Sequence, residues 1–167
     1  MIEELTEEIG ALDCELLAWH IGNAASQWLA AIPGIGMSNA IAIAATVTYP
    51  EQFYLSQWFA VLCRKHAFGV TLGLSPWQRT TVGRERLDRI SNQGDRYIRT
   101  LMVHGASAVL GKAGGNQDAR SQWIVRMRER RQPTVVAVAL ANKSARIVWS
   151  ILSRGEDYRP ARMAAAA

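Results

Sequence analysis

The sequence predicts an all-α fold, a helical bundle with a coiled-coil-like arm at its N-terminus. Apolar residues recur three and four positions apart along most of the chain, which is the helical period. Gly and Pro clusters separate these segments, and a hydrophobic content of 49% over 167 residues suffices for one core. We expect the arm over residues 1–28, a helical domain over 29–158 and a disordered tail over 159–167.

The first element is a helix over residues 2–31, with a break expected at Gly22-Asn23. Its apolar positions are Leu5, Ile9, Leu12, Leu16 and Trp19. This spacing is typical of a coiled-coil arm, and we expect the chain to form homo-oligomers through it.

A Pro-Gly-x-Gly turn, Pro33–Gly36, follows, and a second helix runs from the turn to about Thr48. The pattern resembles a helix-hairpin-helix motif, in which backbone N–H groups at a helix N-terminus hold a DNA phosphate. Gly34 and Gly36 are therefore candidate DNA-binding residues. The alternative is an ordinary αα-hairpin with a glycine turn.

A helix is expected over Glu51–Phe68, and a polar loop over Leu72–Gly94. The loop combines glycines, the hydroxyls of Thr80 and Thr81, and several arginines, a mixture that suits phosphate oxygens. A solvated basic loop is the alternative interpretation.

The next helix covers about Asp95–Leu110, with Asp95 as its N-cap. Tyr97 and Ile98 are core candidates, and His104 is expected as a hydrogen-bonded core residue. A glycine-rich loop leads from this helix to Asp118.

The last two helices are expected over Ala119–Arg131 and Thr134–Leu152. The former is rich in arginine, which indicates a nucleic-acid footprint or simply a solvated face. The latter should be the most buried element, with Lys143 and Arg146 together on one face.

The bulk composition agrees with a nucleic-acid partner. The net charge is +5, and the excess is carried by arginine. Cys14 and Cys63 occur at no metal-ligand spacing, so no zinc site is expected. No apolar run is judged long enough to span a bilayer, and we expect no membrane partner.

Several long motifs resemble, in order, a known family. They are Ile32–Gly36, Leu72–Pro76, Gly83–Leu87, Arg89–Ser91, Gly94–Ala106 and Val138–Trp149. They are similar to the C-terminal domain of insertion-sequence transposases of the IS one-ten family, closest to its IS eleven-eleven subgroup. The resemblance covers about Leu29 to Tyr158.

The resemblance implies a function in DNA transposition and recombination. Full-length members carry an N-terminal RuvC-like domain whose acidic residues bind a divalent metal, and some members use a guide RNA. The C-terminal domain supplies a serine nucleophile. We expect this chain to be a truncated member without the RuvC-like domain, with no cofactor of its own, located in the bacterial cytoplasm at the nucleoid.

The chain departs from the family pattern at the nucleophile. Thr81 stands at the serine position and Val82 at the following glycine, so we expect the chain to be inactive alone. If chemistry remains, Thr81 is the nucleophile, and Ser91 is a weaker alternative. Arginines of the loop would stabilise the phosphate charge.

The sequence thus predicts the DNA-binding C-terminal domain of a transposase, and a non-catalytic helical DNA- or RNA-binding module is the alternative. DNA is the expected partner, with a guide RNA as a further one. The predicted DNA-binding residues are Gly34, Gly36, Arg79, Arg84, Arg86, Arg89, Arg96, Arg99, Arg126, Lys143 and Arg146.

Overall fold

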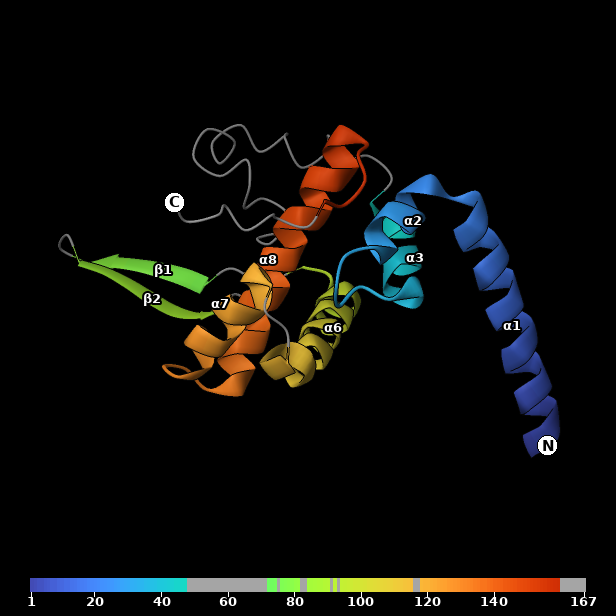
Figure 1. The fold of residues 1–167 in the computed structure, drawn as a ribbon, viewed down its shortest axis with the longest axis horizontal. Coiled ribbons are helices and arrows are strands. Elements are labelled where there is room, and N and C mark those ends of the chain that lie inside the picture. Colours follow the sequence, from blue (N-terminus) through green and yellow to red (C-terminus); the bar gives the residue numbers. More distant parts are fainter. Residues whose placement is uncertain are drawn as a thin grey trace.

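The computed structural model describes residues 1–47, 72–74, 76–81, 84–90, 92, 94–115 and 118–159. The elements in these ranges are α1 (Ile2–Gly22), α2 (Ala24–Ala30), α3 (Met37–Thr46), β1 (Pro76–Thr81), β2 (Arg84–Ile90), α6 (Arg96–Lys112), α7 (Ala119–Arg128) and α8 (Pro133–Arg154) (Figure 1). The helices confirm the all-α prediction. The helix expected over Glu51–Phe68 lies outside the described residues.

Helix α8 is the centre of the core and packs mainly on α6 (Figure 1). It begins with Pro133, which is compatible with the first helical turn, and it ends at Gly155 in the left-handed conformation, with φ of 64°. Its buried residues are Val136, Ala137, Leu140, Ala141, Ser144, Ala145, Val148 and Ile151. The prediction that this is a deeply buried helix is therefore confirmed.

The length and hydropathy of α8 also match those of a membrane-crossing helix, contrary to the expectation that no apolar run would be long enough. Composition alone does not separate such a helix from the core helix of a globular protein. In this structure the apolar side of α8 is covered by the body of the bundle, so burial in the core accounts for its hydropathy.

Helix α1 projects from the body as an arm and has no buried residue (Figure 1). It ends at the expected break, because Asn23 leaves the helical conformation and its side chain accepts the Ser26 N–H at 2.9 Å. The Ser26 side chain is fully buried, and its Oγ lies 2.7 Å from Nδ1 of His20. These contacts fix the angle at which the arm leaves α2.

The turn between α2 and α3 lies directly against α6. Gly34 has a φ of 91°, and an added Cβ there would lie 3.0 Å from the Gly105 carbonyl oxygen. In the same way, a Cβ on Gly105 would overlap the Gly34 carbonyl oxygen. Asn39 Nδ2 donates to the Leu101 carbonyl at 3.1 Å and thereby holds α3 on α6.

The segment expected as a loop contains an antiparallel hairpin, β1–β2, which extends from the body (Figure 1). A polar loop was predicted over Leu72–Gly94, because threonines and arginines of this segment do not alternate with apolar residues as in a half-buried strand. The structure corrects that expectation, while the class of the fold remains helical.

Helix α6 corrects two smaller expectations. Its buried stripe is Ile98, Met102, Ala106 and Leu110. His104 lies about 200° around the helix from Met102 and is exposed, and the Tyr97 side chain is 65% exposed. The predicted N-cap is confirmed, since Asp95 Oδ1 accepts the Ile98 N–H at 2.9 Å.

Candidate nucleic-acid interface

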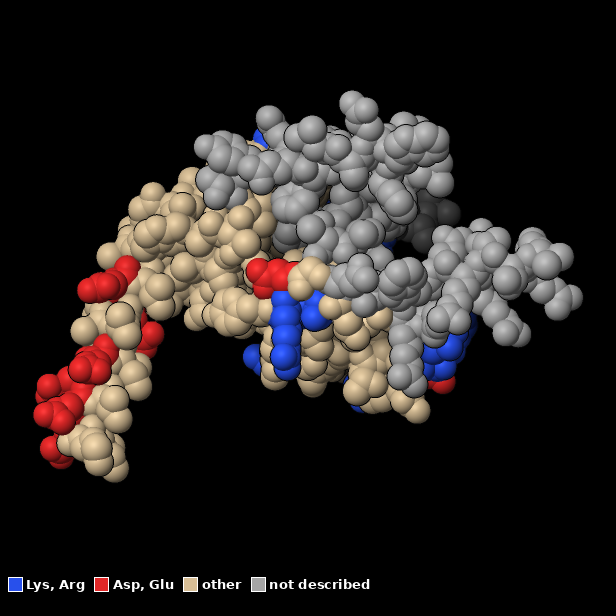
Figure 2. All heavy atoms as spheres, turned by 180° about the vertical axis from the view of Figure 1, so that it is seen from behind, with Lys and Arg blue, Asp and Glu red and all other residues tan. Residues whose placement is uncertain are grey.

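The charges of the chain are separated in space. The arm α1 carries six acidic residues and no Lys or Arg. Seen from behind, acidic side chains gather along this arm, whereas the Lys and Arg side chains lie on the body (Figure 2). All basic side chains that could meet a polyanion therefore lie outside α1.

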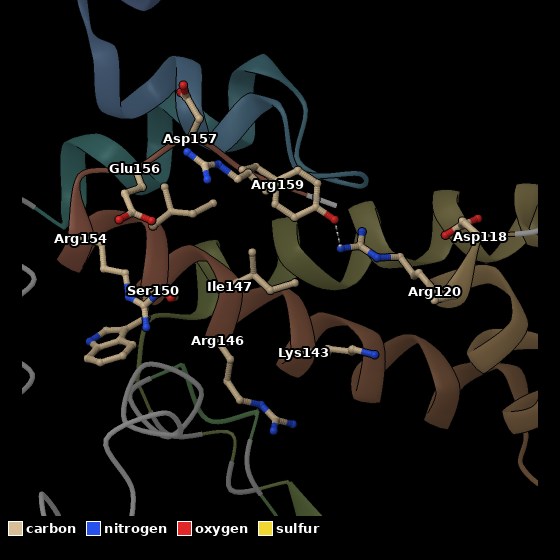
Figure 3. A pocket seen from close by; sticks show the side chains of 14 residues that line it. Asp118, Arg120, Lys143, Arg146, Ile147, Ser150, Arg154, Glu156, Asp157 and Arg159 are labelled. Carbon is tan, nitrogen blue, oxygen red and sulfur yellow. Dashed lines mark hydrogen bonds between the residues drawn. The ribbon is translucent and has the colours of Figure 1, made fainter. Parts of the chain in front are cut away.

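A pocket of about 670 Å³ gathers basic side chains on the body. Its floor is α8, one wall is the start of α7, and the segment after α8, residues 155–159, closes another side (Figure 3). Its basic lining residues are Arg120, Lys143, Arg146, Arg154 and Arg159, and its acidic ones are Asp118, Glu156 and Asp157. The pocket therefore carries a net positive charge.

Arg120 ties the walls of this pocket together. Its Nη1 donates to the Pro33 carbonyl at 2.8 Å, and its Nη2 donates to the Tyr158 hydroxyl at 3.2 Å (Figure 3). The guanidinium carbon lies 5.9 Å from the centroid of the Tyr158 ring. A guanidinium has five N–H donors, so Arg120 keeps donors for an anion in the pocket.

Lys143 is the most perturbed base of the pocket. Partial burial lowers the pKa of its ammonium, and the positive charges of Arg120 and Arg146 lower it further. The ammonium lies 4.7 Å from the centroid of the Trp123 ring. Within the described part of the chain the recorded ion pair is Met1–Glu4, so Lys143 and Arg120 have no carboxylate partner there.

The acid nearest the start of α7 has a structural role. The Asp118 carboxylate caps this helix by accepting the Ser121 N–H at 3.2 Å. Hydrogen bonding to Ser121 lowers the pKa of Asp118. This carboxylate therefore stays ionised at the start of α7, and it forms no ion pair with Lys143.

The structure brings together only part of the predicted DNA-binding set. Lys143 and Arg146 both line the pocket, although Arg146 points to a different edge in Figure 3. Arg126 and Arg96 are exposed on α7 and α6 and do not line it. Arg99 instead donates from Nη1 to the Leu72 carbonyl at 2.9 Å, so it holds the chain that precedes β1.

The two glycines of the turn differ in their surroundings. Gly34 is required by its positive φ and by its contact with α6. Gly36 is exposed, has open space around it, and is the N-cap of α3 without a side-chain cap. The first N–H groups of α3 are therefore not capped by the Gly36 position.

The hairpin aligns the remaining predicted positions. Thr81 is paired with Arg84, and Arg79 is paired with Arg86. Arg89 lies further along β2. Ser91 and Val82 lie outside the described residues.

Several residues of the pocket are not among the predicted DNA-binding residues, namely Arg120, Arg154, Tyr158 and Arg159. Arg120 lies in the helix predicted to be rich in arginine, and Tyr158 has no local signal because its partner is 38 positions away. In the described ranges, no three His, Cys, Asp or Glu side chains come close enough to hold a metal ion.

Comparison with known proteins agrees with the resemblance. Residues 26–123 match the family model described as Transposase IS116/IS110/IS902 family. The chain is 43% identical over 159 residues to the "Probable family 20 transposase" of Pseudomonas aeruginosa, covering 95% of this chain and 44% of that protein.

Two further relatives carry similar names. The "Transposase for insertion sequence element IS1111A" of Coxiella burnetii is 36% identical over 153 residues, which are 92% of this chain and 40% of that protein. The "Transposase for insertion sequence element IS1328" of Yersinia enterocolitica is 33% identical over 154 residues, which are 92% of this chain and 43% of that protein. The chain thus spans less than half the length of these relatives.

Proposed function

Because the chain belongs to the IS116/IS110/IS902 family of transposases, we propose that it is the DNA-binding part of such an enzyme and acts in the transposition of an insertion sequence. One observation carries this proposal: Arg120 and Lys143 reach the same pocket from two different helices. Bringing like charges together costs free energy unless an anion compensates them. For a transposase, the phosphates of DNA are the expected anions.

The proposal is tested by measuring binding of the chain to a labelled duplex across a salt series. We expect the logarithm of the affinity to fall linearly with the logarithm of salt concentration. Lys143→Met should weaken binding and reduce the slope by about one, as for loss of one phosphate contact. Lys112→Met is the matched control, because Lys112 is an exposed lysine at the end of α6 and does not line the pocket.

The alternative of a mere solvated face makes a different prediction. In that case both lysine variants would change binding equally, because only net charge would matter. An RNA partner, such as a guide RNA, would be revealed by competition with unlabelled RNA in the same assay. We propose DNA as the main partner and guide RNA as a further one, which also implies a cytoplasmic, nucleoid-associated protein.

A second candidate activity concerns Thr81. The register that pairs Thr81 with Arg84 and Arg79 with Arg86 is the observation that favours it. In this activity the Thr81 hydroxyl oxygen would bond to a DNA phosphorus while the bond from that phosphorus to one sugar oxygen breaks, and the departing sugar oxygen would take up a proton. Arginines of the hairpin would stabilise the phosphate charge. Since Val82 stands where the family pattern has glycine, we propose that residues 1–167 on their own bind DNA without cleaving it. A covalent protein–DNA adduct that disappears in Thr81→Ala would overturn this.

We further propose that the chain self-associates through α1. Leu5, Ile9 and Leu12 are 54–60% exposed on an arm that contacts the body only near its end. Such an exposed apolar stripe is stabilised when a second helix covers it. Light scattering of the chain and of Leu12→Glu is the test, and monomers in both samples would contradict self-association.

A further inference from the structure

The geometry points to a pocket that takes one unpaired nucleotide, with its phosphate at Arg120 and Lys143 and its base against Tyr158 and Ile147. This inference rests on the proposed nucleic-acid binding and specifies which form of nucleic acid this site accepts. It concerns the pocket between α7, α8 and residues 155–159 (Figure 3).

The shape of the site is the first reason. A duplex presents its phosphates on a convex surface, and flat or protruding basic surfaces suffice to meet them. This site is instead a concave pocket of about 670 Å³. Its volume lies in the range of about 300–1,000 Å³ that small-molecule and cofactor sites occupy. A pocket of this size has room for a base and sugar in addition to one phosphate.

The chemistry of the lining is the second reason. Lys143, Ile147 and Ile151 are spaced by four residues, so they form one stripe along α8. The stripe begins with a cation and continues with the partly exposed Ile147, whereas Ile151 is buried in the core below it. A phosphate alone needs no apolar wall, whereas an unstacked base does.

The placement of an aromatic ring is the third reason. The Tyr158 ring, whose hydroxyl accepts a hydrogen bond from Arg120, lines the same pocket as Ile147. The ring packs against the core and is held by the Arg120 hydrogen bond, so it is positioned before any ligand arrives. Bases stack on aromatic rings regardless of sequence, because every base has a π-face.

The charges of the lining favour one end of the pocket for the phosphate. Glu156 and Asp157 lie away from Arg120 and Lys143, and Arg154 and Arg159 balance them there (Figure 3). The excess positive charge is therefore at the end with Arg120 and Lys143. We place the phosphate of the nucleotide at that end.

The test compares a fluorescein-labelled single-stranded thymidine oligonucleotide with a duplex of the same length, in anisotropy titrations of the full chain. An oligouridine of equal length separates DNA from RNA as the source of the nucleotide. Tyr158→Ala is expected to weaken single-strand binding about tenfold and duplex binding less than twofold, since one base–aromatic stack is worth about that factor. Tyr158→Phe keeps the ring and should retain most of the single-strand affinity.

Tyr97→Ala is the matched control, because Tyr97 is an exposed tyrosine on α6 that does not line the pocket. Equal losses for single strand and duplex in Tyr158→Ala, or an equal effect of Tyr97→Ala, would overturn the inference. Tight, salt-dependent duplex binding that is unaffected by Tyr158→Ala, without any single-strand preference, would refute only the nucleotide pocket. Absence of binding to all three probes would refute the proposed function itself.

Discussion

Replacing Gly105 by alanine should destabilise the protein, although alanine is the better helix former. Gly105 lies in the middle of α6, where a glycine usually costs about 0.5–1 kcal/mol relative to alanine. Here the added Cβ would overlap the carbonyl oxygen of Gly34 and would lie 3.3 Å from Nδ2 of Asn39. The obstacle is a backbone atom of a tight turn, which cannot rotate away as a side chain would.

The magnitude follows from these opposing effects. Overpacking of a well-packed contact costs about 1–3 kcal/mol, and the helix propensity returns less than about 1 kcal/mol. We therefore expect the free energy of unfolding to fall by about 1–2 kcal/mol. For a chain of this length, that corresponds to a melting temperature lower by about 2–8 °C. The displaced turn is also the one that carries Gly36 at the start of α3.

Gly111→Ala provides the control in the same helix. Gly111 is exposed and an added Cβ there meets nothing within 4 Å, so this change should raise stability by about 0.5 kcal/mol. Thermal unfolding followed by circular dichroism of both variants measures the difference. If Gly105→Ala melted at or above the temperature of the wild type, the close contact between α6 and the turn would be refuted.

Substitutions of Lys143, Arg99 and Asp95, and a change of pH, test other parts of the structure. Lys143→Met should raise the melting temperature, because the lowered pKa of Lys143 indicates that its charged form is unfavourable in the fold. The same change should weaken DNA binding. An unchanged melting temperature would contradict this reasoning. As the pH rises toward the ordinary lysine pKa of 10.5, the free energy of unfolding of the wild type should increase, because the unfolded chain then binds more protons than the folded one. DNA affinity should fall over the same range, because Lys143 loses its positive charge in the folded chain. Lys143→Arg should abolish this loss of affinity. Arg99→Met should lower the free energy of unfolding by about 1–3 kcal/mol, because it leaves the buried Leu72 carbonyl without its hydrogen-bond donor. The salt dependence of DNA binding should not change. A weaker salt dependence would make Arg99 a phosphate contact instead. Asp95→Ala should cost about 1 kcal/mol in urea unfolding through loss of the α6 cap, and no loss would refute that role.

The helices could be predicted from the sequence because their signals are local. The cap at Asp95, the break at Gly22-Asn23 and the start at Pro133 each depend on residues within one turn. Which face of each helix is buried could be predicted less well. Tyr97 and His104 were assigned to the core from apolar content, but the buried stripe of α6 is set by its contact with α8, which the sequence does not state.

The hairpin and the pocket illustrate why the rest could not be predicted. Strand pairing of β1 with β2 depends on the register of two polar segments, and polar segments lack the alternation that reveals a strand. The pocket depends on Arg120 meeting Tyr158 and Pro33, which are 38 and 87 positions away. Such contacts are a property of the packed fold, and no spacing along the chain encodes them.

The pocket also explains why Lys143, a cation whose charge is unfavourable in the fold, is useful within it. Lys143 shares its surroundings with Arg120 and Arg146, and their mutual repulsion is part of what lowers its pKa. A residue chosen for stability at this half-buried position would be apolar, as Ile147 is one turn further along α8. An anion reverses the balance, because it turns the same charges into attractive partners in a partly desolvated site. Lys143 thus lowers the stability of the free protein and raises its affinity for an anion. A Lys143→Met protein that is more stable but binds DNA more weakly would demonstrate this exchange directly.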